Sequence, residues 1–208
     1  DLIDFANWSS CMTGPQSAIV TGPEGEEIYT DEFGRVKVQF HWDREGRYDE
    51  NSSCWIRVVY PWAGSGYGIG AVPRVGHEVL VDFYEGDPDQ PVILGGVHNR
   101  TSRVPYLLPT HKTKSVWKSG SSPGGGGSNE ITFEDARGKE QVFIHAERNL
   151  DRQVKVDESV TIGVNLQTSV GQCEARTIGK DQAIQVSGDR SVTVQGRYST
   201  QAAAMVSQ

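Results

Sequence analysis

The sequence has little of what would build one large apolar core, a membrane anchor or a disulfide framework. Hydrophobic residues make up 36% of the 208 residues, which is below the usual share for a globular chain. There is no run of about 18 apolar residues, so no transmembrane helix is expected. The three cysteines, Cys11, Cys54 and Cys173, are widely spaced and form no CxxC pair, which is typical of free thiols made in a reducing compartment. The first residues lack a basic segment followed by an apolar one, so we expect no secretory signal peptide.

Positive charge is scarce in the first half of the chain. The net charge is −7, and residues 17–100 carry 14 acidic but only 7 basic side chains. Because nucleic-acid affinity depends largely on Lys and Arg neutralising phosphates, we expect no nucleic-acid partner. Aromatic residues of this region could stack on bases, but with this charge they are expected in a core or a protein interface. They are Trp42, Trp55, Tyr60, Trp62 and Tyr67.

Catalytic and metal-binding patterns are weak. The S-x-x-K pattern from Ser115 to Lys118 lies in an expected loop, without the companion motifs of an acyl-transfer enzyme. Glu85, Asp87 and Asp89 lack the spacing of an EF-hand loop, and the glycine run lacks the G-K-[ST] of a phosphate loop. The histidines occur singly rather than at zinc-ligand spacing. We therefore expect no enzyme activity, cofactor or metal site in these residues.

Residues 17–100 have the alternation of antiparallel β-strands. In "GRVKVQFHW", Val36, Val38, Phe40 and Trp42 share one face, and polar residues occupy the other. Further alternating or apolar stretches are separated by turn signals such as "DREG" and "EGDPDQP". About five short strands without a helical period predict a small closed barrel. The further stretches are residues 53–62, 77–87 and 90–97.

The flanking and connecting segments are less regular. Residues 1–16 have no clear period and are expected to form an irregular N-terminal segment. Residues 101–128 are expected to be a linker or loop, which the run "SGSSPGGGGS" makes flexible by composition. Residues 129–153 are expected to form a neck of two short strands around the turn "DARG".

Residues 154–208, which we call the shaft, carry an eight-residue repeat. Every Val, Ile and Leu between Val154 and Val194 stands at an even position, and from Ile162 onward glycine follows the repeated residue by one or two positions. Eight is a multiple of the two-residue strand period, so each repeat returns to the same face, with bends at the glycines. The pattern is therefore extended rather than helical.

A single ribbon of this kind has one apolar face and nothing to cover it, so it would be marginal in water. Winding of several copies around an axis would bury these faces against each other. A β-solenoid within one chain is the alternative, although its coils usually need about 20 residues or more. We predict an intertwined homotrimeric triple-stranded β-helix whose axis is faced by twelve side chains. They are Val154, Val156, Val160, Ile162, Val164, Leu166, Val170, Ile178, Ile184, Val186, Val192 and Val194.

Several long motifs resemble a known family. "EIYTDEFGRVKVQFHWDREG", "SCWIRV", "PRVGHEVLVDF" and "GDPDQPVILGGV" closely resemble the central domain of VgrG proteins, the spike proteins of the bacterial type VI secretion system. "NEITFEDARGKEQVFIHAERN" resembles the neck of the same family, and the octads resemble its shaft. The resemblance covers roughly residues 14–196 and implies an all-β chain, an OB-fold barrel followed by the trimeric β-helix.

The resemblance also implies a function. It implies a puncturing tip that is carried on a tube of Hcp rings, capped by a PAAR-repeat protein and loaded with effector proteins. Such a spike is assembled in the bacterial cytoplasm without a signal peptide, pierces the target membrane transiently and is injected into target cells. The large N-terminal domains of the family are absent from this sequence, and the octad pattern fades after Gly196. A carrier or enzyme whose activity lies in an extension outside this chain is the alternative.

Overall fold

The computed structural model describes residues 12–202. Most of the expected irregular segment 1–16 and the last six residues of the expected shaft lie outside the described residues. The chain divides into two compact units, Asp1–Arg152 and Gln153–Gln208, which are considered separately. No helix among the described residues has the length and apolar character needed to cross a bilayer.

A five-stranded sheet forms the barrel of the first unit. The strand order is β2-β1-β6-β7-β3, with β3 parallel to β7 and the other neighbours antiparallel. Val36 and Ile56, which precede β2 and β3, exchange both backbone hydrogen bonds and so join the two outer strands of this order. The barrel is therefore closed, which leaves few unpaired edges. The strands are β1 (Gln16–Thr21), β2 (Lys37–Phe40), β3 (Arg57–Val58), β6 (Glu78–Phe83) and β7 (Pro91–Val97).

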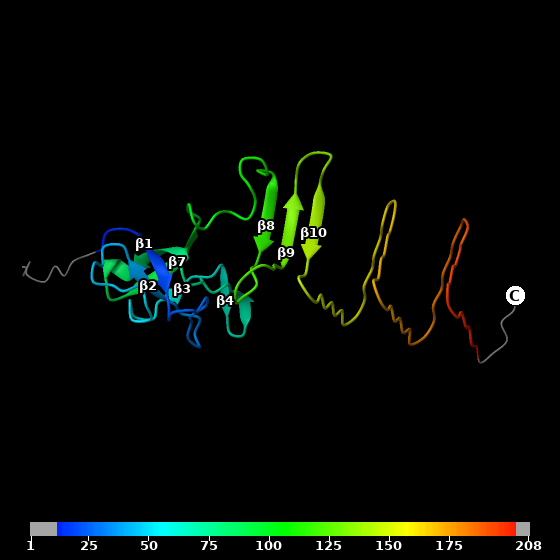
Figure 1. Cartoon of the computed structure of the whole chain (residues 1–208), viewed down its shortest axis with the longest axis horizontal. Helices are drawn as coiled ribbons and strands as arrows, with labels where there is room; N and C mark the ends of the chain where they lie inside the picture. The colour runs from blue at the N-terminus through cyan, green and yellow to red at the C-terminus, as the bar shows by residue number, and fades with distance from the viewer. Residues whose placement is uncertain (1–11, 203–208) are drawn as a thin grey trace, which may run out of the picture. The chain divides into compact units, whose positions relative to one another are not determined.

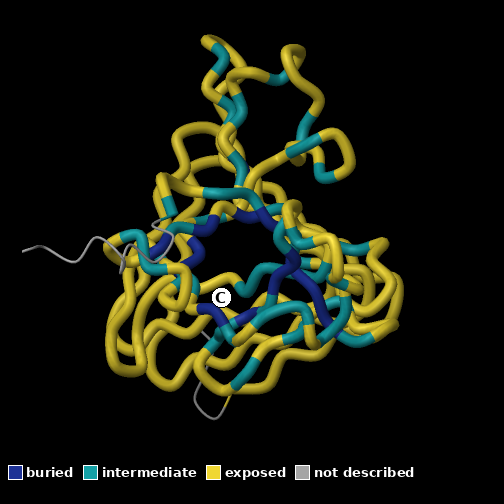
Figure 2. Tube along the Cα trace, turned by 90° about the vertical axis from the view of Figure 1, so that its left-hand side faces the viewer, coloured by how far each residue is buried: buried dark blue, intermediate teal, exposed yellow. Residues whose placement is uncertain are grey.

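Small β-branched side chains fill the barrel. Val79, Val81 and Phe83 of β6 alternate with more exposed neighbours, as the sequence predicts. In Figure 2 the buried segments, dark blue, lie inside a surround of exposed chain, yellow. Burial of each such residue stabilises the barrel by about 1.5–3 kcal/mol. The core consists of Ala18, Val20, Val36, Val38, Ile56, Val79, Val81, Phe83, Val92 and Ile93.

Two residues of "GRVKVQFHW" differ from the predicted alternation. Gln39 was expected on the outer face but is fully buried, because the turn after β2 folds over it. Its amide donates to the Asp43 carboxylate at 2.8 Å, and a Cβ on Gly46 would lie only 1.9 Å from the same amide. Trp42 was expected on the inner face but is 60% exposed, because the chain turns after Phe40. Its indole N–H donates to Gln16 at 2.7 Å.

The expected strand over residues 53–62 is broken into shorter pieces. Only Arg57–Val58 forms a strand of the barrel, next to the bridged Ile56, and the chain then forms a hairpin of β4 (Trp62–Gly64) and β5 (Tyr67–Ile69). All residues of this hairpin are exposed, and the Trp62 and Tyr67 rings pack edge to face at 5.7 Å. After β6, the chain makes one 3₁₀ turn, η2 (Tyr84–Gly86), in which Glu85 has a positive φ.

A second sheet follows the barrel in the sequence and has the order β10-β9-β8 (Figure 1). β9 (Glu130–Glu134) and β10 (Gln141–His145) are the two neck strands that the sequence predicts around "DARG". The expectation that residues 101–128 form only a linker is wrong, because Lys114–Lys118 forms β8 and pairs with β9. Its five residues are too few to give a clear period in the sequence. We call the sheet of β8, β9 and β10 the neck sheet.

The glycine-rich loop between β8 and β9 is folded against the barrel. The Glu27 carboxylate accepts hydrogen bonds from the Ser122 hydroxyl and the Gly124 N–H, both at 2.6 Å. These two bonds hold the pKa of Glu27 below its usual value. The Arg74 guanidinium donates to the Gly120 carbonyl at 2.6 Å. The loop is therefore not the flexible linker that its composition predicts. The first three of its four successive glycines, Gly124, Gly125 and Gly126, have positive φ, which other residues rarely adopt.

Candidate functional site: an uncovered apolar shaft and the neck sheet before it

The shaft bends at regular intervals in its own chain. The trace of the second unit, yellow to red in Figure 1, winds back and forth through the described shaft residues. A bend follows each repeated Val or Ile directly, and glycine occupies one of the two bend positions in every repeat from Ile162 onward. These bends confirm the turns that the glycine spacing predicts. They lie at residues 155–156, 163–164, 171–172, 179–180, 187–188 and 195–196.

The twelve predicted axis residues are all exposed to solvent in the single chain. Their exposed fractions run from 40% at Ile178 to 88% at Val164. The six of them that recur every eight positions, from Val154 to Val194, are the least exposed, between 40% and 49%. An apolar face of this length in water is unfavourable, because each Val or Ile gains about 1.5–3 kcal/mol on burial. The face therefore needs a partner.

The backbone of the shaft forms no sheet within its own chain. Within residues 153–202 no strand or β-bridge is formed. A solenoid within one chain would pair successive coils, and the described part of the shaft has no such pairing. Extended backbone with unpaired N–H and C=O groups is satisfied most completely by strands of other chains. The single chain therefore carries two unmet requirements, which are apolar cover and backbone pairing.

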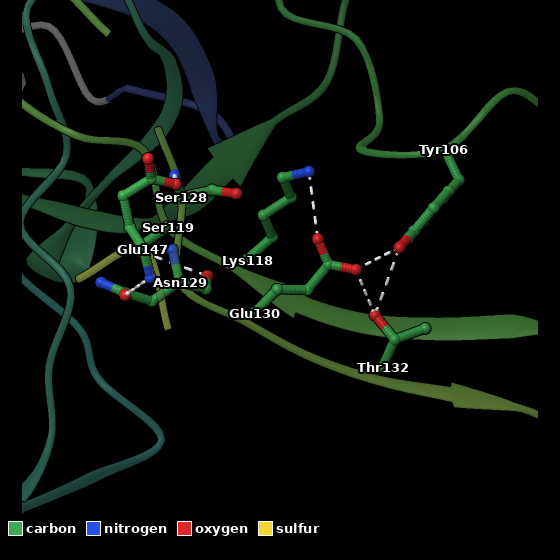
Figure 3. Close-up of polar contacts among 8 residues, drawn as sticks. All are labelled: Tyr106, Lys118, Ser119, Ser128, Asn129, Glu130, Thr132 and Glu147. Atoms are coloured by element: carbon green, nitrogen blue, oxygen red, sulfur yellow. Dashed lines mark hydrogen bonds and ion pairs between the residues drawn. The ribbon is translucent and has the colours of Figure 1, made fainter. Parts of the chain in front are cut away.

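A buried carboxylate lies on the polar face of the neck sheet, at the start of its middle strand (Figure 3). Glu130 on β9 is 6% exposed. Its Oε1 accepts hydrogen bonds from the Tyr106 hydroxyl and, at 2.6 Å, from the Thr132 hydroxyl. Its Oε2 lies 3.1 Å from the Lys118 ammonium group. The hydrogen bonds from Thr132 and Tyr106, followed by Lys118, lower the pKa of Glu130 to about 2.

Comparison with known proteins decides what this architecture is. A family described as the type VI secretion system/phage-baseplate injector OB domain matches residues 16–98. A second, the bacteriophage T4 gp5 C-terminal trimerisation domain, matches residues 115–207. The type VI secretion system spike protein VgrG4b of Pseudomonas aeruginosa is 57% identical over 152 residues, which are 73% of this chain and 19% of that protein. VgrG1a of the same organism is 48% identical over 205 residues, which are 94% of this chain and 32% of that protein.

The chain belongs to the VgrG family. It spans between about a fifth and a third of the length of these VgrG relatives. The matched boundaries fit the structure, since the OB match begins with β1 and the trimerisation match begins inside β8. The predicted fold, an all-β OB barrel followed by a β-helical shaft, is confirmed at this level.

One VgrG relative is named as a toxin. The actin cross-linking toxin VgrG1 of Vibrio cholerae is 46% identical over 181 residues, which are 87% of this chain but 16% of that protein. In the VgrG chain described here, the S-x-x-K residues do not come together. Ser115 and Lys118 lie in a strand, where residues three apart point to opposite faces of the sheet. Among the residues that the structure describes, no three His, Cys, Asp or Glu side chains gather in a way that could hold a metal ion.

The pKa of Glu130 predicts how acid affects the VgrG neck sheet. Because the pKa falls from 4.5 in the free residue to about 2, folding favours the ionised form. Its contribution is complete above about pH 4.5 and is lost as the pH falls toward 2. Glu130→Gln is expected to lower the free energy of unfolding by about 2 kcal/mol at pH 7, the usual value of hydrogen bonds to a charged group.

Denaturant titrations at pH 7, 4 and 2.5 measure this difference. The gap between wild type and Glu130→Gln should shrink steadily over that range. The exposed Glu140→Gln, on the turn before β10, serves as the matched control and should follow wild type throughout. A gap that stays constant with pH would contradict the assigned role of the carboxylate.

Proposed function

We propose that this chain is the barrel and shaft of a homotrimeric puncturing spike of a type VI secretion machine. The observation that carries the proposal is the exposed apolar face of the shaft, repeated every eight residues inside the region that matches a trimerisation domain. Three copies would direct the twelve even-numbered apolar residues to a common axis. Each chain would then supply the backbone partners that the others lack.

The mechanism is mechanical rather than chemical. In a three-stranded shaft, backbone groups pair between chains and no edge remains free, so the shaft resists buckling under load. The barrel and the neck are also coupled, since the glycine-rich loop is held to the barrel through Glu27 and Arg74. Force applied to the barrel would therefore reach the neck without a flexible joint. We infer no catalytic residue and no cofactor in this chain.

The proposed partners follow from the family. An Hcp tube would carry the spike, a PAAR-repeat protein would cap it, and effector proteins would travel with it. The spike would be assembled in the cytoplasm, would pierce the target membrane transiently, and would be secreted into target cells. These partners belong to the complete VgrG proteins, of which this chain covers only a part.

The proposal is tested in bacteria that carry the full-length spike protein. Ile178→Asp, which places a charge on the apolar face, should prevent release of the spike and delivery of effectors. Thr177→Asp, which adds the same charge on the other face, should leave both intact. Normal delivery by Ile178→Asp would mean that the shaft is not the working part.

A second candidate function is that of a carrier or enzyme whose activity lies in an extension outside these 208 residues. The observation that favours it is the toxin relative, of which this chain covers 16%. Production of this chain alone and of the full-length protein in target cells separates the two candidates. Toxicity confined to the full-length protein would favour the second.

A further inference from the structure

The middle strand of the neck sheet, β9, buries its polar residues and exposes its apolar ones. In β9, Glu130 and Thr132 are buried, whereas Ile131 and Phe133 between them are 37% and 47% exposed. A sheet that covers its own chain's core would have the opposite pattern. The inversion indicates that the apolar face is built to meet something other than the chain's own core.

Strand register joins these exposed residues into one surface. Trp117 of β8, Ile131 of β9 and Ile144 of β10 are aligned across the three strands. Phe133 and Val142 form the next aligned pair on the same face. Ile144 and Val142 are 59% and 63% exposed, and Trp117 is 68% exposed. We call these five residues the neck face.

Part of the opposite face of the sheet is covered by the same chain. Tyr106, from the segment between β7 and β8, donates to Glu130 on that side (Figure 3). The ammonium group of Lys114 lies 4.4 Å from the centre of the Tyr106 ring, and that of Lys118 lies at 6.0 Å. Since this side holds the chain's own polar contacts, the neck face is the side left for another molecule.

The most consistent occupant is a second copy of this chain. The trimerisation match begins at residue 115, so the neck face lies inside the trimerisation domain rather than beside it. The chain also runs from the end of β10 at His145 to the first octad residue, Val154, within a few residues. We propose that three neck faces pack together and that this contact sets the register of the shaft. The proposal rests on the homotrimer proposed above.

The shaft needs such a device because its own sequence repeats. If one chain slips by eight residues, each of its octad residues between Val154 and Val194 moves to the position of the next octad residue. That residue is also Val or Ile, so the apolar contact is kept. The octad column therefore cannot distinguish the correct alignment from one that is shifted by a whole repeat. Discrimination within the shaft falls to the even positions between the octad levels, among which Gln172, Arg176 and Lys180 are polar. The neck face does not repeat, so its packing has one alignment.

The test uses the full 208-residue chain with a spin label on Cys173, which lies in the third octad and is exposed. The other thiols are removed by Cys11→Ser and Cys54→Ser. Pulsed electron paramagnetic resonance then measures the distance between labels on different chains. In the parent protein, a single interchain distance is expected.

Ile144→Lys on the neck face should add longer distances, or should abolish the trimer while the barrel stays folded. Gln141→Lys, on the opposite face of the same strand, should leave the single distance unchanged.

A second measurement does not depend on any neck variant folding. Oxidative footprinting of the wild-type trimer should find Trp117 protected, with the protection lost in denaturant. Two results would overturn the register role without contradicting the trimer. One is a single interchain distance in an Ile144→Lys variant that still has the mass of a trimer. The other is an oxidation rate of Trp117 that is the same in the trimer and in denaturant. A wild-type chain that is monomeric would overturn the homotrimer and this inference together.

Discussion

Ile178→Asp is expected to abolish the trimer near neutral pH and to allow partial recovery in acid. Ile178 is the fourth residue of the octad column, and in a trimer the substitution places three carboxylates around one axis. Each chain loses about 1.5–3 kcal/mol of apolar burial, and the like charges cannot all remain ionised at close range. Assembly therefore raises the pKa of these carboxyl groups above the ordinary value of about 3.9. Because the trimer favours the protonated form, its stability falls as the pH rises through that range.

The matched control is Thr177→Asp, one residue earlier on the other face of the strand. Light scattering on a sizing column at pH 7 and pH 4 separates the two variants. Thr177→Asp should remain trimeric at both pH values. A trimeric Ile178→Asp at pH 7 would mean that the even-numbered face does not point toward the axis.

Deletion of one residue is expected to damage the shaft more than deletion of eight. Removal of Ser169 moves every later residue to the opposite face, so Val170, Ile178 and the apolar residues after them turn outward. Removal of residues 162–169 takes away Ile162, Val164 and Leu166 from each chain but preserves both the parity and the period. The smaller deletion should therefore expose the distal half of the shaft, whereas the larger one should give a shorter intact shaft.

Limited trypsin digestion followed by mass spectrometry measures the outcome. Cleavage after Arg176, Lys180 and Arg190 should be fast in the one-residue deletion and slow in both wild type and the octad deletion. Equal resistance of the two deletions would contradict the two-residue period. Equal sensitivity would contradict the eight-residue repeat.

The barrel could be predicted well from the sequence because its alternating stretches are long. Residues 77–87 gave a strand whose buried members, Val79, Val81 and Phe83, match the pattern. The octads were equally clear, since a strict parity over many residues has no helical interpretation. Gln39 and Trp42 were placed on the wrong faces because the turn after β2 begins at His41 and the alternation ends there.

The neck was harder to predict, for physical reasons that act beyond the local sequence. The glycine-rich loop is ordered by Glu27 and Arg74, which are distant in the sequence, so its composition alone indicated a flexible segment. β8 was missed because a five-residue strand with lysine at both ends gives little pattern. The inversion of β9 could not be read from "EITFE", because apolar residues in an alternating strand are ordinarily assigned to the buried face.

The mass of the chain in solution tests the central claim most directly. Light scattering on a sizing column, repeated over a dilution series, gives this mass without any substitution or label. Burial of the exposed shaft face between copies predicts three times the mass of a single chain, with no dissociation on dilution. A chain that is monomeric at every concentration would contradict the intertwined shaft.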